Sequence, residues 1–288
     1  METYTLQYAS DIHLETAFVH FNTIIEPIAT DLALCGDIGD PFSNVYFDFL
    51  KWASQRWTRV FLLAGNHEYY TENPEIVMSD VEVQIRKVCS AVGKNVIFLQ
   101  KDSFIIHSHK IIVVGATLWT NPDLRCWGLL NDGFIGDPGY RGDYNAIYFK
   151  DEYTGKGRPA HPSDIGRLCG NHSAFLERTL NPTWGSIPEG WRVVVLTHHL
   201  PTFLLNDVKF KDNAFKSCYA ISLDKLIKEP VVAWLCGHSH KASHIRLDSG
   251  TFVGLNPLGY LSERNNSGFS RKASISIYRE NIAIPRKE

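Results

Sequence analysis

Residues 60–68 read Val-Phe-Leu-Leu-Ala-Gly-Asn-His-Glu, an apolar run that ends in a short polar block. The apolar part is typical of a buried strand, and the polar part is typical of the loop at the end of that strand. In open α/β sheets, ligands bind where the strands end in this way. The segment therefore predicts an α/β fold in which a buried strand delivers Asn66 and His67 to a functional site.

Four other polar blocks follow apolar runs in the same way. They are Asp11-Ile12-His13, Gly36-Asp37-Ile38-Gly39-Asp40, His198-His199 and Gly237-His238-Ser239-His240. Each block alone is also typical of a turn or a helix start. Five such loops at one rim would gather the nitrogen and oxygen donors that suit Mn, Zn or Fe, so the combination predicts a metal site.

Apolar runs predict nine strands. They cover residues 5–9, 32–35, 60–63, 96–99, 111–115, 193–196, 231–236, 251–255 and 274–278, the last as an edge strand. Helical patterns cover 42–52, a segment from Pro74 to Gly93, and a segment that ends at Leu180. Their alternation with the first strands indicates βαβ units, and the later strands predict a second, more antiparallel sheet packed against the first.

The composition sets limits on the class of protein. At 288 residues, the chain is long enough to form one domain, 1–288, with a large core. The formal charge of −2 and the lack of a Lys/Arg run argue against duplex nucleic acid as a partner. No apolar run reaches the roughly 18 residues of a membrane span, and the six cysteines lack C-x-x-C spacing. We expect a cytoplasmic protein with mostly buried thiols, whose oligomeric state the sequence leaves open.

Residues 120–162 interrupt the alternation with a stretch rich in Gly, Asp, Tyr and Pro. A long loop inside a compact domain is usually a lid or a binding loop, and the aromatic residues argue against full disorder. We expect this insertion to cover the site, with a passive insertion as the alternative. Arg141, Lys156 and Arg158 are candidates to bind a second phosphate, although solvated loop charges explain them equally well.

The five blocks together resemble the calcineurin-like metallophosphoesterases, also called binuclear metallophosphatases. The family signature is D-x-H, G-D-x-x-D, G-N-H-[DE], an isolated H after a strand, and G-H-x-H, and this chain matches it in order from Asp11 to His240. Residues 116–120, 131–132, 197–199 and 256–260 are similar to a little-characterised cytosolic branch. The resemblance implies a four-layer α/β/β/α sandwich of two mixed sheets flanked by helices, with the metals where the strand ends converge.

The resemblance also implies two divalent metal ions, with Mn²⁺ the first choice and Zn²⁺ or Fe²⁺ the alternatives. All five blocks would contribute ligands. They would be Asp11, His13 and His240 for one ion, Asn66, His198 and His238 for the other, and Asp37 as a bridge between them. A hydroxide shared by both ions would attack phosphorus in line with the leaving oxygen.

By the same resemblance, His67 would face the leaving group without binding metal, and Asp40 would hold the other nitrogen of its ring. The alternatives are a helix cap for Asp40 and a structural loop position for His67. His199 would be a substrate contact or a donor behind the metals. Asn131 and Arg141 are further candidate substrate contacts.

These features predict a metal-dependent hydrolase of small or flexible phosphate monoesters or diesters. A nuclease or a cyclic-nucleotide phosphodiesterase is an alternative within the same chemistry. A non-catalytic, metal-binding scaffold for protein interactions is the alternative from a different class. The presence of all seven ligand positions and of His67 favours catalysis.

Overall fold

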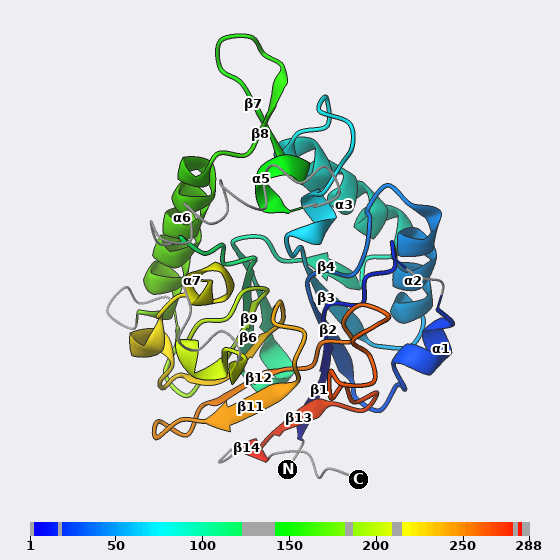
Figure 1. Ribbon diagram of the computed structural model, residues 1–288. Helices are drawn as coiled ribbons and strands as arrows, with labels where there is room; N and C mark the ends of the chain where they lie inside the picture. Colours follow the sequence, from blue (N-terminus) through cyan, green and yellow to red (C-terminus); the bar gives the residue numbers. More distant parts are fainter. Residues whose placement is uncertain are drawn as a thin grey trace.

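Two six-stranded sheets form the centre of the computed structural model, which describes residues 3–16, 19–122, 142–181, 187–208 and 215–278 and the backbone of 282–283 (Figure 1). The first sheet has the order β14-β13-β1-β2-β3-β4. Its strands are β1 (Tyr4–Ala9), β2 (Asp31–Cys35), β3 (Arg59–Leu63), β4 (Val96–Phe98), β13 (Ser274–Ile277) and β14 (Ile282–Ala283). The second sheet has the order β11-β12-β10-β9-β6-β5. Its strands are β5 (Asp102–Ile106), β6 (Ile111–Ala116), β9 (Arg192–Thr197), β10 (Val231–Cys236), β11 (Ser243–Arg246) and β12 (Phe252–Leu255).

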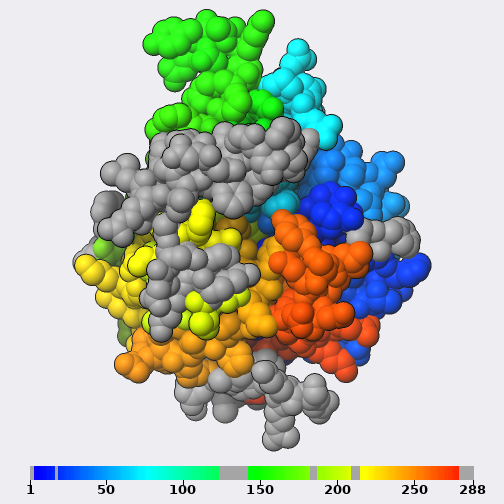
Figure 2. Space-filling view, viewed as in Figure 1, coloured from blue at the N-terminus to red at the C-terminus, as the bar shows by residue number. Residues whose placement is uncertain are grey.

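Helices cover the outer face of each sheet, as Figure 1 shows. The helices on the side of the first sheet are α1 (Phe21–Ile24), α2 (Asn44–Ser54) and α3 (Met78–Val92), and those on the side of the second sheet are α6 (Pro162–Leu180) and α7 (Lys216–Tyr219). The short helix α5 (Asp143–Ala146) precedes a hairpin made of β7 (Tyr148–Lys150) and β8 (Gly157–Pro159). This hairpin projects from the body of the molecule (Figure 2).

Three apolar clusters separate the layers. Along β9, Val194 and Leu196 enter the cluster between the two sheets, whereas Val193 and Val195 enter the cluster that also contains Leu176 of α6. This alternation arises because successive strand residues point to opposite faces of a sheet. The third cluster lies between the first sheet and helices α2 and α3. The predicted four-layer α/β/β/α sandwich of two mixed sheets is thereby confirmed.

Several local predictions need correction. The two sheets are equally mixed, because each has three parallel and two antiparallel strand pairs among the described strands. The strand at 274–278 is not an edge strand, because β13 pairs with β1 on one side and with β14 on the other. The second sheet also has edge strands at β5 and β11 that the apolar runs missed, because their residues are largely exposed.

Two helices begin later than the sequence suggested. The helix expected from Phe42 begins at Asn44, where the Ser43 hydroxyl caps it by accepting the N–H of Tyr46. The helix expected from Pro74 begins at Met78, because Asn73 and Pro74 lie in a turn in which Asn73 Oδ1 accepts the N–H of Glu75. Within the described residues, no helix has the length and apolar character needed to cross a bilayer.

Candidate metal centre

The five polar blocks begin where β1, β2, β3, β9 and β10 end. Strands β1 to β3 run parallel in one sheet, and β9 and β10 run parallel in the other, so each set of loops lies at one edge. Backbone bonds join neighbouring loops: Asp11 N–H donates to the Gly36 carbonyl at 3.0 Å, and Gly237 N–H donates to the His198 carbonyl at 2.8 Å. The backbone N–H of His238 donates to the Asp11 carboxylate at 3.0 Å and so connects the two sheets. The blocks therefore form one site where both sheets end.

The backbone of these loops is strained at the residues that carry the donor groups. Asp11, His13, Asp37, His238 and His240 all have positive φ values, between 50° and 71°. Residues other than glycine rarely adopt this left-handed conformation, and each one costs about 1–3 kcal/mol of folding free energy. Strain of this kind persists where the surrounding structure holds it and is typical of functional sites.

Glycines make room for the donor groups. A Cβ atom at Gly65 would collide with Asp37 Oδ1, and one at Gly237 would lie 2.7 Å from Asp11 Oδ2. A Cβ at Gly36 would lie 2.5 Å from His198 Nδ1, and the φ of 86° at Gly36 is itself a glycine conformation. The glycines in the G-D and G-N-H blocks are therefore required by close approach to buried polar side chains.

The first group of converging donors contains Asp11, His13, Asp37 and His240, whose candidate ligand atoms all lie within 4.8 Å of one another. His240 Nε2 lies 3.3 Å from Asp11 Oδ1, and His13 Nε2 lies 3.9 Å from Asp37 Oδ2. Asp11, His13 and Asp37 are almost fully buried. Buried carboxylates and imidazoles that converge in this way are suited to a divalent cation.

The second group contains Asp37, His198 and His238, also within 4.8 Å. His198 Nε2 lies 3.4 Å from Asp37 Oδ2, the same oxygen that faces His13 in the first group. Asn66 joins this group, because its Oδ1 lies 3.0 Å from His198 Nε2. The structure thus brings together all seven residues predicted as metal ligands, in two groups that share Asp37.

Outer hydrogen bonds turn the Nε2 atoms of both histidines in the first group towards the centre of the site. Glu15 Oε1 lies 2.9 Å from His13 Nδ1, and Glu263 Oε2 lies 2.6 Å from His240 Nδ1. When Nδ1–H donates to a carboxylate, Nε2 of a neutral ring carries a lone pair and acts as an acceptor. These two Nε2 atoms face each other at 3.0 Å. A proton or a metal ion must lie between them, so the donor set fits a bound cation.

The second group is oriented in the same way. His198 Nδ1 donates to the Cys35 carbonyl at 2.9 Å, which turns Nε2 inward. The Asn66 amide nitrogen donates to the Tyr70 hydroxyl and to Asp143 Oδ1, both at 3.0 Å, which turns its Oδ1 inward. The inward atoms of His198 and Asn66 are therefore available as metal ligands.

The charges of the site favour cations. Burial alone would lower the pKa of His198 and of His240, but Asp37 beside His198 and Asp11 beside His240 outweigh burial and raise these pKa values to about 9 and about 10. Burial and the charge of His198 lower the pKa of His238 to about 3, so this ring keeps a free lone pair. A metal ion competes with protons for such nitrogens.

Glu68 connects two of the loops. Its carboxylate accepts the backbone N–H groups of Asp37 at 2.9 Å, Ile38 at 2.7 Å and Gly65 at 2.7 Å. Burial and the charge of Asp37 raise the pKa of Glu68 to about 8, although the backbone donors oppose that shift. Glu68 therefore does not belong to either ligand group and holds the loops after β2 and β3 together.

The surroundings of His67 correct the prediction for Asp40. His67 Nδ1 lies 3.3 Å from Glu15 Oε1, and its Nε2 lies 2.9 Å from the Tyr260 hydroxyl. Asp40 instead accepts the N–H of Phe42 at 2.9 Å in the turn before α2. Asp40, the last residue of the G-D-x-x-D block, thus caps the turn, and Glu15 supplies the carboxylate beside His67.

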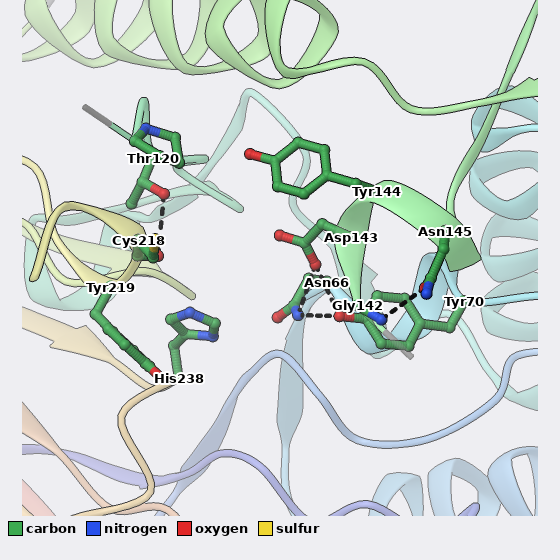
Figure 3. Close-up of a pocket in the computed structure, with 11 residues that line it drawn as sticks. Asn66, Tyr70, Thr120, Gly142, Asp143, Tyr144, Asn145, Cys218, Tyr219 and His238 are labelled. Carbon is green, nitrogen blue, oxygen red and sulfur yellow. Dashed lines mark hydrogen bonds between the residues drawn. The ribbon is translucent and has the colours of Figure 1, made fainter. Parts of the chain in front are cut away.

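A cavity of about 120 Å³ opens beside the second group of ligands. Figure 3 shows Asn66 and Asp143 on one side of this cavity, with His238 and Tyr219 on the other. Gly142, Asp143, Tyr144 and Asn145, from the middle of the 120–162 insertion, contribute to its lining. This part of the insertion therefore lies beside the candidate metal centre.

The remaining predicted contacts are placed differently. His199 is buried between the rings of Trp119, at 5.6 Å, and His238, at 4.1 Å, so it packs behind a ligand. Arg158 pairs with the Asp164 carboxylate at 2.6 and 3.0 Å on the projecting hairpin, and is thereby occupied. Lys156 lines a separate hollow against residues 74–80. Asn131 and Arg141 fall outside the described residues.

The sequence patterns missed four residues that hold the site: Glu15, Tyr70, Asp143 and Glu263. Glu15 follows the D-x-H block by two residues. This position alone did not predict a role, because many acidic residues follow turns. Asp143 and Glu263 lie 77 and 23 positions from the side chains they orient, and no local spacing indicates such pairs. Tyr260 lies in the 256–260 stretch that the sequence had marked, although without a role.

Comparisons with known proteins agree with this geometry. Residues 8–242 match the family model for the calcineurin-like phosphoesterases. An uncharacterised protein of Acanthamoeba polyphaga mimivirus is 28% identical in an alignment of 294 residues that covers 94% of this chain and 96% of the viral protein. The crystal structure of the phosphopantetheinyl hydrolase from Mycobacterium tuberculosis is similar, with a TM-score of 0.68 and 15% identity over 98% of this chain and 96% of that one. At this identity, the structural likeness concerns the fold.

Proposed function

This chain belongs to the calcineurin-like phosphoesterase family, and from this premise we propose that it hydrolyses small or flexible phosphate esters with two Mn²⁺ ions. One observation carries the proposal. Two groups of largely buried donors converge on the same Asp37 carboxylate, which is the arrangement of a carboxylate that bridges two ions. Neither group includes a thiolate, and a set of imidazole, carboxylate and amide donors suits Mn²⁺, with Zn²⁺ or Fe²⁺ as alternatives.

Two bound divalent ions would supply charge neutralisation for the phosphoryl group and would lower the pKa of solvent water to give a nucleophile. Asp11, His13 and His240 would hold one ion, Asn66, His198 and His238 the other, and Asp37 both. His67 projects from the loop after β3, and its Nε2 is free to donate a proton to the leaving oxygen once substrate displaces the Tyr260 hydroxyl. A positioned proton donor of this kind contributes about 10²–10⁴-fold to the rate.

The surroundings of the site support a small substrate. The adjoining cavity measures about 120 Å³, and its lining includes no Lys or Arg among the described residues. The formal charge of −2 gives no electrostatic track for duplex nucleic acid. A cyclic-nucleotide phosphodiesterase remains compatible with this chemistry, whereas a duplex-specific nuclease is less so. The free, buried cysteines at positions 35, 89, 169 and 236 suit the reducing cytoplasm.

Hydrolysis of p-nitrophenyl phosphate and bis-p-nitrophenyl phosphate with added Mn²⁺ tests the proposal. The protein should hydrolyse at least one of them, Asp37→Asn should abolish turnover, and His67→Ala should reduce it by about 10²-fold or more. His244→Ala is the matched control, because this exposed histidine lies on β11 outside both ligand groups. Silence of the wild-type protein towards a full panel of phosphate esters, with both metal ions verified by elemental analysis, would instead support the scaffold.

A further inference from the structure

We propose that Glu15 is the residue that positions His67 for proton donation to the leaving group, an inference that rests on the function proposed above. The family resemblance implied Asp40 in this role. The structure places a different carboxylate there, from the loop after β1 rather than the loop after β2.

The contacts of Glu15 define its geometry. One oxygen, Oε1, lies 2.9 Å from His13 Nδ1 and 3.3 Å from His67 Nδ1. The two rings lie edge to face, with centroids 4.5 Å apart and an interplanar angle of 77°. The Glu15 side chain is 26% exposed, and its second oxygen lies towards Gly39, where an added Cβ would be 3.6 Å away. Glu15 thus contacts a predicted metal ligand and the predicted proton donor at the same time.

Other contacts complete the orientation of His67. The Tyr70 ring stacks on it at 4.3 Å with an interplanar angle of 30°. The backbone N–H of His67 donates to Asp37 Oδ1 at 2.8 Å, which fixes the chain next to the shared carboxylate. With Nδ1 held by Glu15, Nε2 points to the Tyr260 hydroxyl at 2.9 Å. We assign that hydroxyl position to the leaving oxygen of a bound substrate.

The resulting step balances without any further reactant. Water attacks phosphorus and releases one proton to solvent, the bond from phosphorus to the leaving oxygen breaks, and the Nε2 proton of the His67 imidazolium moves to that oxygen. The ring becomes neutral and keeps its Nδ1 proton in the hydrogen bond to Glu15. The ring takes up a proton from solvent before the next turnover. Glu15 exchanges no proton with substrate, so it is a positioning residue.

A pair of substrates that differ only in the leaving group tests this role. Methyl p-nitrophenyl phosphate releases a stable anion, whereas methyl phenyl phosphate needs protonation as its bond breaks. Glu15→Gln should reduce kcat/KM for the phenyl ester by about 10- to 100-fold and should reduce it much less for the nitrophenyl ester. In a protein that already carries His67→Ala, Glu15→Gln should cause little further loss of kcat/KM, because the two residues act as a unit.

Glu263→Gln is the matched control. Glu263 contacts His240 as Glu15 contacts His13, through Nδ1 of a predicted metal ligand. It also accepts the backbone N–H of Tyr260 at 3.0 Å, whereas Glu15 lies against the His67 ring itself. Glu263→Gln should change kcat/KM for the two esters by the same factor. Equal effects of Glu15→Gln on both esters, at unchanged metal content, would show that Glu15 serves only His13 and would overturn the proposal.

A second measurement is independent of turnover. Long-range ¹H–¹⁵N spectra of the Zn²⁺-loaded protein should show His67 with its proton on Nδ1 when the ring is neutral. Glu15→Gln should change that tautomer signature, and neither Glu263→Gln nor Asp40→Asn should do so. A change in Asp40→Asn alone would return the role to Asp40. If the wild-type protein hydrolyses no ester of the full panel, with both metal ions verified, while the tautomer behaves as described, the proposed function fails but the positioning of the His67 ring by Glu15 stands.

Discussion

His172 shows how a single buried side chain supports the site from behind. Its Nδ1 accepts the backbone N–H of Leu118 at 3.1 Å, and Leu118 has a left-handed φ of 54°. The loop that contains Leu118 follows β6, and the backbone N–H groups of His198 and His199 donate to the carbonyl of Thr117 in that loop. His172 therefore holds the backbone that supports one of the ligand loops.

The acid sensitivity of the fold should depend on this residue. Burial, aided by the charge of Lys101, lowers the pKa of His172 from 6.5 to about 3 in the folded protein. Below 6.5 the unfolded chain therefore binds a proton that the folded chain excludes, so the free energy of unfolding decreases as the pH falls. Between about pH 7 and about pH 5, protonation of His172 in the unfolded chain should lower the free energy of unfolding by about 2 kcal/mol.

Replacement by glutamine tests this expectation, because Gln can still accept the Leu118 N–H but does not titrate. Denaturant unfolding at both pH values should show a smaller acid-induced loss for His172→Gln than for the wild-type protein. His161→Gln is the control, since His161 caps the same helix at its exposed start. An identical loss in the wild-type protein and His172→Gln would contradict the assignment.

At the scale of elements, the short helix α5 links the insertion to the metal centre. Asp143 at its start accepts a hydrogen bond from Tyr70 at 2.8 Å and one from Asn66 at 3.0 Å. Burial raises the pKa of Asp143, and the two donors oppose that shift. The insertion thus contributes an orienting group to a candidate ligand as well as part of the cavity wall.

Asp143→Ala should therefore lower the affinity for the ion held by Asn66, His198 and His238 more than the affinity for the other ion. Loss of an outer partner typically costs about 10- to 100-fold in metal affinity. Calorimetric titration of the metal-free protein with Mn²⁺ should show two binding steps in the wild-type protein, of which only one weakens in the variant. Asp151→Ala, in the exposed turn of the same insertion, should leave both steps unchanged. Equal weakening of both steps would show that α5 acts on the fold rather than on Asn66.

The sequence predicted elements well where burial controls them. Apolar runs located β2, β3, β9 and β10 to within one residue at each end, because strands buried on both faces leave a continuous hydrophobic signal. The edge strand β5 escaped because its residues are largely exposed. The starts of α2 and α3 escaped because side-chain hydrogen bonds in the preceding turns decide them. The partner of His67 escaped for a similar reason, since Asp40 and Glu15 are both acidic residues in loops and only the folded backbone selects between them.

At the scale of the whole molecule, the two sheets combine to make one centre. The first sheet supplies Asp11, His13, Asp37 and Asn66 from the ends of β1, β2 and β3, and the second supplies His198, His238 and His240 from β9 and β10. The apolar cluster between the sheets keeps both sets of strand ends in register. Neither sheet alone carries a complete group of ligands, so packing of the sandwich is a condition for metal binding.

The most direct test is anomalous X-ray diffraction from crystals of the protein grown with Mn²⁺. Two strong peaks should appear, one among Asp11, His13 and His240 and the other among Asn66, His198 and His238, with Asp37 in contact with both. Crystals of Asp37→Asn should lose at least one of the peaks. A single peak, or two peaks of which neither touches Asp37, would contradict the shared-carboxylate centre.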